Sequence, residues 1–273
     1  MSGSVKLLFQ PAEEATNLGA REMVARGCLE DPHVDEVYGL HVDDQRPCGT
    51  VGARIGPTKA SSDRIVVKIT GKSAHGTRPE LGVDAVFVAA EVVVGLHAML
   101  SRRVGALKNI SLNIGVIQGG TAANIIAQEA SLQISLRTTD PAMRPYMFEE
   151  ITRTINGICE LNLATAEIEI SEGCRSVVND KECVEHVYAL SERLLGPGHF
   201  TFTPELCMGS EDFSCYTQHI PSCFYDLGIR NEERGITARL HNCHFDVDEN
   251  AIPIGILMHS AIVLEKLCGI VVD

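Results

Sequence analysis

Two adjacent glutamates, Glu13 and Glu14, follow a short apolar run that ends in Pro11 (LLFQPAEE). Two carboxylates that share one cavity repel each other, which raises one of their pKa values unless a cation lies between them. If Glu14 binds a divalent ion, Glu13 is free to accept a proton from a water whose pKa the ion lowers. The alternative is a structural role, because carboxylates in a first helical turn interact favourably with the helix dipole.

Two histidines near the ends of predicted strands are further candidate ligands. His41 lies near the end of the run VDEVYGLHV, and His241 follows ITARL. In open α/β sheets, reactive groups gather beyond the carboxyl ends of the strands, and imidazole together with carboxylate suits zinc or manganese. His41 could instead be an ordinary hydrogen-bonded histidine at a strand end. His244 and Cys243 beside His241 add donors but do not fix a geometry.

The elements that must position these residues divide the chain into two domains. Strands and helices alternate on both sides of residues 59–173, which indicates one α/β sheet built from residues 1–58 and 174–273. Ser4–Phe9 is predicted as the first strand of that sheet. Within the insert, residues 61–172 follow the order β-α-β-β-α-β, which is that of a ferredoxin-like sandwich with two helices on one face of its sheet.

The predicted helices rest on apolar periodicity and on the residues that begin and end them. They cover Leu18–Arg26, Asp84–Arg103, Pro141–Leu161, Asp180–Leu195 and Ile252–Leu267. The other predicted strands cover the sequences VDEVYGLHV, DRIVVKITGKSAH, NISLNIGVIQGG, ASLQISLRTTD, ATAEIEIS and SCFYDLGI.

Composition argues against several classes of partner. The 36 acidic residues outnumber the 23 basic ones and give a net charge of −13, which repels phosphate backbones and anionic membrane surfaces. The longest apolar stretch, Ala85–Leu100, contains Glu91 and His97 and is judged too short to span a membrane. No signal-peptide pattern is seen, and the ten cysteines include no Cys-x-x-Cys pair. We therefore expect a cytoplasmic protein with reduced, mostly buried thiols.

Seven segments, taken together and in order, resemble the metal-dependent amidohydrolases of the aminoacylase and hippurate-hydrolase type (peptidase family M20), which include plant auxin-conjugate hydrolases and related carboxypeptidases. The segments span nearly the whole chain: FQPAEE (9–14), YGLHV (38–42), GKSAHGTRPELGVDAV (71–86), GGTAANIIA (119–127), SLRTTD (135–140), MGSEDFS (208–214) and LHNCHFDVDENAI (240–252). The resemblance implies a metal-dependent exopeptidase-like catalytic sheet with an inserted lid domain that commonly dimerises. It also implies cleavage of the amide bond of N-acyl amino acids or small peptide-like conjugates.

The resemblance assigns catalytic and metal-binding roles to particular residues. Glu13 matches the general base that activates metal-bound water, and Glu14, His41 and His241 match metal ligands. His75 in GKSAHGTRP matches a lid histidine that polarises the scissile carbonyl, often from the partner subunit, although the residue alone would be read as an exposed turn histidine. The metal is expected to be manganese or zinc, with two ions in a complete family member.

The resemblance also indicates residues that contact the substrate or line the site. Asn124 and Arg137 match lid positions that hold the substrate, and the guanidinium fork suits a carboxylate. Arg137 could equally be a solvated charge on a strand. Glu211 and Asp212 in GSEDF resemble carboxylates of the site wall or of its second layer, whereas Ser210 followed by acidic residues is also a helix-start pattern.

The chain departs from the family pattern at its beginning. Family members carry a further segment that ends in His-x-Cys-Gly-His-Asp and supplies a cysteine and a histidine to the two-metal site, and no such motif precedes Ser4. Two functions of different classes are therefore expected: a metallo-amidohydrolase, or a catalytically impaired fragment that acts as a dimeric binding protein. A cysteine-rich metal buffer is a third possibility, which the lack of closely spaced cysteines argues against.

Overall fold

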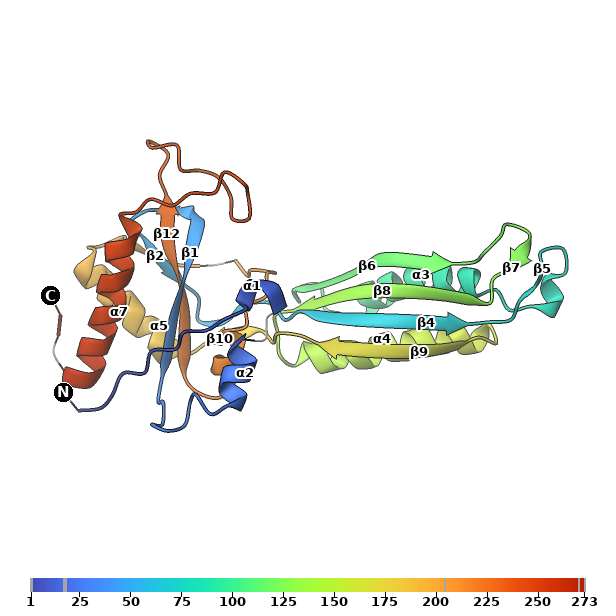
Figure 1. Ribbon diagram of the computed structural model, residues 1–273, viewed down its shortest axis with the longest axis horizontal. Coiled ribbons are helices and arrows are strands. Elements are labelled where there is room, and N and C mark those ends of the chain that lie inside the picture. The colour runs from blue at the N-terminus through green and yellow to red at the C-terminus, as the bar shows by residue number, and fades with distance from the viewer. Residues whose placement is uncertain (1, 17–18, 204, 270, 273) are drawn as a thin grey trace. The chain divides into compact units, whose positions relative to one another are not determined.

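The structure is a computed structural model that describes residues 2–16, 19–203, 205–269 and 271–272 (Figure 1). It divides into two compact units. The first unit comprises Met1–Lys59, Val177–Cys207 and Glu211–Asp273, and the second comprises Ala60–Ser176 and Met208–Ser210. Two of the boundaries, Lys59/Ala60 and Ser176/Val177, lie one and three residues after the boundaries expected from the sequence.

The first unit is built on a four-stranded mixed sheet with the strand order β1-β12-β2-β11. Strand β12 is parallel to β1 and antiparallel to β2. The strands of this sheet are β1 (Val37–Pro47), β2 (Val51–Ala53), β11 (Phe200–Phe202) and β12 (Ser222–Arg230). The helices of the unit are α1 (Glu13–Thr16), α2 (Gly19–Ala25), α5 (Lys181–Leu194), α6 (Ser214–Thr217) and α7 (Ala251–Cys268).

Alternate side chains of the central strand β12 face two different cores. Tyr225 and Leu227 join the core formed with α5 and α7, whereas Phe224 joins the core formed with α2 and α6. Figure 1 shows α5 and α7 on one side of the sheet and α2 on the other. Because strand side chains alternate, Asp226 lies on the same face as Phe224. The nearly continuous apolar sequence of β12 fits a strand that is covered on both faces.

The strand predicted at Ser4–Phe9 is wrong, because these residues pair with no strand in the described part of the chain. Burial alternates along the segment as it would in a strand: Leu8 packs against the core of α2 and α6, while Leu7 and Phe9 are 72% and 85% exposed. Strand β1 is consequently an edge of the sheet. The sequence pattern identified a backbone with alternating faces, but pairing also needs a partner strand, which local sequence does not encode.

The first unit contains a two-stranded antiparallel ribbon at the point where the chain leaves it for the inserted segment and returns. Strand β3 (Gly56–Lys59) pairs with β10 (Val177–Asn179), and Lys59 lies opposite Val177. The side chain of Asn179 fastens the ribbon to β12, since its amide donates to the carbonyl oxygen of Phe224 (2.9 Å) and its Oδ1 accepts from the backbone NH of the same residue (2.8 Å).

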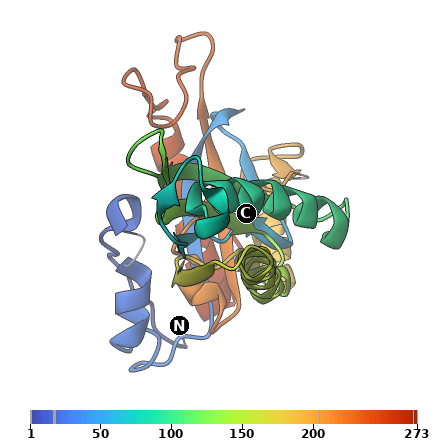
Figure 2. The ribbon, with the colours of Figure 1, turned by 90° about the vertical axis from the view of Figure 1, so that its right-hand side faces the viewer.

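The second unit confirms the predicted β-α-β-β-α-β order. Its four antiparallel strands have the order β6-β8-β4-β9, and α3 and α4 pack against each other on one face (Figure 2). The elements are β4 (Asp63–Thr70), α3 (Ala85–Arg103), β6 (Ile110–Gly119), β8 (Glu129–Thr138), α4 (Met143–Leu161) and β9 (Thr165–Glu172). Three short elements lie between them: β5 (Ala74–His75), a 3-10 helix η1 (Pro79–Leu81) and β7 (Ile125–Ile126).

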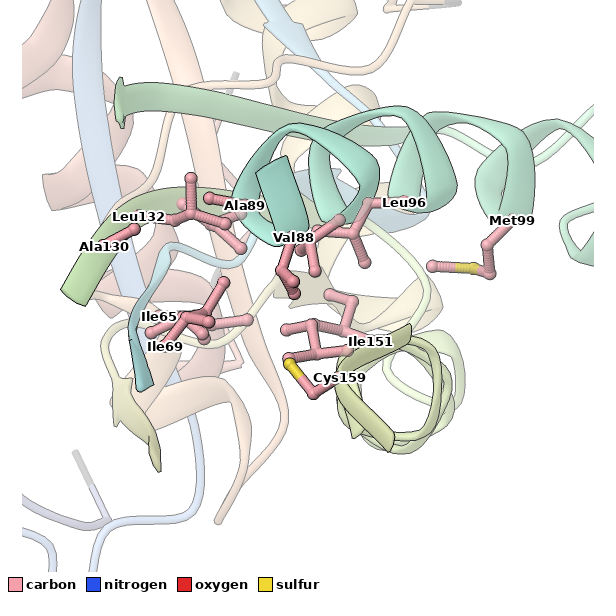
Figure 3. Packing of buried hydrophobic residues seen from close by; sticks show 14 of the residues in the cluster. Ile65, Ile69, Val88, Ala89, Leu96, Met99, Ala130, Leu132, Ile151 and Cys159 are labelled. Atoms are coloured by element: carbon pink, nitrogen blue, oxygen red, sulfur yellow. The ribbon is translucent and has the colours of Figure 1, made fainter. Parts of the chain in front are cut away.

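Strict alternation along β4 builds the core of this unit. Ile65 and Ile69 are buried beneath the helices, and Lys68 between them is exposed. Figure 3 shows these isoleucines beside Val88 of α3 and Ile151 of α4, residues that a helical spacing places on the inner face of each helix. The period-2 and period-3.6 patterns of the sequence are therefore both satisfied by one apolar layer.

Helices α3 and α7 are each long and apolar enough to cross a membrane by length and composition alone. The sequence analysis had judged the apolar stretch of α3 too short for this. In α3, Val88, Val92 and Leu96 are at most 1% exposed against the sheet, and in α7, Met258 and Ala261 are buried in the first unit. Core packing thus accounts for the apolar inner face of both helices.

Candidate metal and catalytic site

His41 and Asp226 lie opposite each other on the parallel strands β1 and β12. His41 packs edge-on against Phe224, with the ring centroids 6.0 Å apart. Its Nδ1 lies 2.7 Å from the carbonyl oxygen of Val42 and must be the donor, because a carbonyl oxygen only accepts. The lone pair of Nε2 is then available to a ligand, which is the usual arrangement of a metal-binding histidine.

Three carboxylates of the same unit come together. Glu13, Glu211 and Asp212 each offer an oxygen within 4.8 Å of the others. Glu13 is half-buried in the first turn of α1, and Glu211 and Asp212 are 7% and 0% exposed in the turn before α6. Among the described residues, this is the single group of three or more potential metal ligands. Buried carboxylates at this separation need a proton or a cation to offset their repulsion.

The pKa values of two of these carboxyls are raised. Burial is the main cause for Glu13, followed by the charges of Glu14 and Asp212, while His41 acts in the opposite direction. Burial raises the pKa of Glu211 to about 7, even though the backbone NH of Phe213 donates to its Oε1 (3.1 Å). Both groups are therefore poised to hold a proton or to sit beside a cation.

The donor chemistry of this cluster fits a divalent ion. Carboxylate oxygens from Glu13, Glu211 and Asp212 are hard ligands, and His41 lies close enough that its protonated form lowers the pKa of Glu13. Zinc and manganese both accept mixed carboxylate and imidazole ligation.

Two residues near the site escaped the sequence analysis. Lys59, at the end of β3, has its Nζ 5.9 Å from the ring centroid of Phe224, and its charge lowers the pKa values of Glu13, Glu211 and Asp226. Burial raises the pKa of Asp226. A lone acidic residue inside the apolar run SCFYDLGI was an available signal for Asp226, because buried carboxylates are rare without a partner. The sequence carried no comparable signal for Lys59.

The structure does not gather the three predicted ligands into one group. Glu14 is exposed on α1, although its charge contributes to the raised pKa of Glu13. His41 lies on β1, beside the carboxylate cluster. His241 is exposed in the long segment after β12, with a left-handed backbone φ of 64°. The ligand roles of Glu14, His41 and His241 stay predictions, and the carboxylate cluster is the feature that the structure adds.

The predicted lid residues all belong to the second unit. His75 ends β5 and is exposed, with its Nδ1 2.8 Å from Oγ1 of Thr77. Asn124 is exposed in the turn before β7. Arg137 is half-buried on β8 and donates from Nη1 to the carbonyl oxygen of Met208 (3.0 Å), so one arm of its fork is already engaged. The roles of these residues toward a substrate likewise stay predictions.

The cysteines are less uniformly buried than expected. Four of them, Cys159, Cys174, Cys183 and Cys223, are buried and behave as small apolar residues, whereas Cys207 and Cys243 are exposed. The structure describes all ten cysteines, and none of them forms a disulfide.

Replacing Glu211 by glutamine should stabilise the metal-free protein at alkaline pH. The folded-state pKa of Glu211, about 7, lies above its ordinary value of 4.5, so this residue's contribution to stability is full below pH 4.5 and is lost as the pH rises through 7. Glutamine does not titrate and can still accept the Phe213 NH. We expect Glu211→Gln to gain about 2–3 kcal/mol over the wild type at pH 8 and nothing near pH 4.

Urea unfolding in the presence of a chelator, at several pH values from 4 to 8, measures this difference. Glu233→Gln, at an exposed position, is the control and should show no comparable trend. A difference for Glu211→Gln that stays constant with pH would show that the folded-state pKa is not raised.

The chain matches known proteins over almost its full length. The sequence model of Peptidase family M20/M25/M40 matches residues 1–265. The chain is 31% identical to "IAA-amino acid hydrolase ILR1-like 4" of Arabidopsis thaliana over 98% of its own length and 61% of that protein's. It is 32% identical to "N-acetylcysteine deacetylase" of Bacillus subtilis over 93% of its own length and 64% of that protein's.

The fold is also similar to solved structures. The crystal structure of the Bacillus subtilis YXEP protein, described as a dinuclear metal binding peptidase from the M20 family, superposes with a TM-score of 0.79 at 29% sequence identity. That likeness covers 96% of this chain and 65% of the solved one. The chain thus spans slightly less than two thirds of the length of each of these three proteins.

Proposed function

The chain belongs to Peptidase family M20/M25/M40, and from this premise we propose that it is a metal-dependent hydrolase of the amide bond of N-acyl amino acids or small peptide-like conjugates. The observation that carries the proposal is the cluster of Glu13, Glu211 and Asp212 beside His41, because it combines a candidate base with candidate ligands. Relatives named for amide hydrolysis, the IAA-amino acid hydrolase and the N-acetylcysteine deacetylase, support the substrate class.

Glu13 is the general base of the proposed reaction. It accepts a proton from the attacking water and then donates it to the leaving amine, a double role that needs a carboxyl able to exist in both states. The raised pKa of Glu13 brings its titration closer to neutral pH, where both proton transfers are feasible. His75 is proposed to stabilise the oxyanion that forms at the carbonyl, and Asn124 and Arg137 to hold the substrate.

The proposed metal ligands are Glu14, His41 and His241, with Glu211 and Asp212 as carboxylates of the site wall or of its second layer. A bound manganese or zinc ion would lower the pKa of water and polarise the scissile carbonyl. His41 is the best prepared of these ligands, because its Nδ1 is already committed to Val42.

A homodimer through the lid is part of the proposal. Strand β6 is an edge of the lid sheet, and the neighbouring helix α3 exposes the apolar side chains of Phe87 and Val94 (53% and 70% exposed). An open strand edge and an exposed apolar patch are both features that partners cover. The net charge of −13 favours a small-molecule substrate over nucleic acid or an anionic membrane, and a cytoplasmic location is proposed on the same grounds as in the sequence analysis.

A catalytically impaired, dimeric binding protein is the second candidate. One observation favours it: His241 and Glu14 are exposed and lie outside the carboxylate cluster. Such a protein would retain the lid and bind a conjugate without hydrolysing it.

Metal loading and an amidase assay separate the two candidates. The purified chain is stripped with a chelator, reconstituted with manganese or zinc, and analysed for bound metal and for release of free amine from a panel of N-acetyl and N-benzoyl amino acids. Stoichiometric metal with turnover supports the hydrolase, whereas trace metal without turnover supports the binding protein. Sedimentation equilibrium on the same sample tests the dimer.

A further inference from the structure

The two glutamates lie in the short segment of residues 11–16, called the Glu13 loop, and one carboxylate binds the chain on both sides of this segment. Gln10 precedes the loop, and Ala20, in the first turn of α2, follows it. Oδ1 of Asp212 accepts a hydrogen bond from Nε2 of Gln10 (2.5 Å), and Oδ2 accepts one from the backbone NH of Ala20 (3.0 Å). Asp212 is fully buried (0% exposed), so water does not compete for these bonds. One side chain, distant in sequence, therefore bridges the two ends of the segment that carries Glu13.

The backbone is also in close contact at this neck. A Cβ added to Gly19 would lie 1.7 Å from the carbonyl oxygen of Pro11, so only glycine fits where these two backbone segments approach each other. Tyr216, which is 2% exposed, donates from its hydroxyl to Oε1 of Gln10 (2.8 Å) and extends the network. Inside the loop, Ala12 has a left-handed φ of 61°, a conformation that non-glycine residues adopt only when their surroundings impose it.

We propose that Asp212 is a positioning residue that clamps this loop and so fixes where the Glu13 carboxylate points; the functional part of the proposal rests on the role proposed above for Glu13. Each oxygen of Asp212 accepts one hydrogen bond from the protein, and these two bonds are what the clamp consists of. Its negative charge is not what the clamp requires. The clamp requires two polar atoms on one short, rigid side chain.

This distinction makes asparagine and alanine informative at the same position. In Asp212→Asn, the remaining oxygen can accept from the Ala20 NH. The new amide can donate to Oε1 of Gln10 after the side-chain amide of Gln10 flips, and Nε2 of Gln10 then donates to the hydroxyl oxygen of Tyr216. Asp212→Ala loses both bonds. We expect Asp212→Ala to lower kcat by about 10²-fold with KM little changed, because small misplacements of a catalytic group have effects of this size. Asp212→Asn, which can keep both bonds, should lower kcat about tenfold less than Asp212→Ala does.

Asp180→Ala is the matched control, because Asp180 is also an aspartate that accepts two hydrogen bonds, from the backbone NH groups of Glu182 and Cys183 at the start of α5. It should lower stability without lowering kcat. Tyr216→Phe removes only the outermost bond of the clamp and should give a smaller loss of kcat than Asp212→Ala, which keeps the test usable if the alanine variant folds poorly.

Metal content and hydrogen exchange complete the experiment. In metal-free protein, the Ala20 amide should exchange faster in Asp212→Ala than in the wild type and should stay protected in Asp212→Asn; this readout holds even if the wild type neither binds metal nor turns over substrate. Unchanged exchange and kcat in Asp212→Ala would overturn the proposal. Equal damage in Asp212→Asn and Asp212→Ala, with loss of bound metal in both, would overturn it in favour of a ligand role.

Discussion

Glu13→Gln should lower the turnover of the reconstituted protein by about 10²–10⁴-fold, which is the range that a positioned general base contributes. Glutamine has nearly the shape of glutamate but cannot accept a proton from water or pass one to the leaving amine. The loss should appear in kcat, since the side chain acts on the reacting atoms. Amine release at saturating substrate, with metal content measured on the same samples, checks this result.

Metal content decides between two roles for this carboxylate. A base that is not a ligand leaves metal binding intact when it is neutralised, whereas Glu14→Gln should reduce the metal content because its predicted role is ligation. Glu30→Gln, at an exposed position in the same unit, serves as the unaffected control. Full turnover in Glu13→Gln would refute the proposed mechanism, and loss of metal in that variant would reassign Glu13 as a ligand within its cluster.

Arg144→Met should destabilise the second unit by about 3–5 kcal/mol, because it leaves a buried carboxylate without its partner. Arg144 donates from Nε and Nη2 to both oxygens of Asp63, with the shortest contact 2.5 Å, and its Nη1 lies 3.0 Å from Glu172. The side chains of Arg144 and Asp63 are 8% and 0% exposed. The guanidinium binds both carboxylate oxygens in a site that excludes water, so solvent cannot take the place of Arg144 when it is removed.

Chemical unfolding followed by circular dichroism measures this loss. Arg153→Met is the control, because Arg153 pairs with Glu150 on the same helix but remains largely exposed, and its removal should change stability little. The double variant Asp63→Leu with Arg144→Met should recover much of the stability, since it leaves no unpaired charge. A single variant as stable as the wild type would mean that the pair is open to solvent.

Local sequence signals predicted the elements whose stability is itself local. Asp84 and Asp180 were expected to begin helices, and each accepts hydrogen bonds from two backbone NH groups of the first turn. The alternation of apolar and polar residues in DRIVVKIT likewise predicted which face of β4 is buried. Ser4–Phe9 shows the opposite case: the same alternation is present, but whether a strand pairs depends on a neighbour far away in the chain.

The candidate site was predictable in its parts but not in its assembly. The resemblance identified Glu13, Glu211 and Asp212 from short motifs, yet nothing in a linear sequence shows that residues separated by almost two hundred positions come together in the fold. Asp226 and Lys59 were missed for a related reason. Their importance comes from burial and from the charges around them, which are properties of the folded chain.

The ribbon of β3 and β10 bears on how this protein could have arisen. Lys59 and Val177 lie opposite each other in that ribbon, so the inserted segment Ala60–Ser176 begins and ends next to two paired residues of the first unit. A short turn between them would close a simple hairpin, and the register of β12 and its neighbours would be unchanged. In evolutionary terms, the lid is a module that an ancestral hairpin could gain, exchange or lose in one event, and its diversity among descendants need not disturb the sheet that carries the carboxylates.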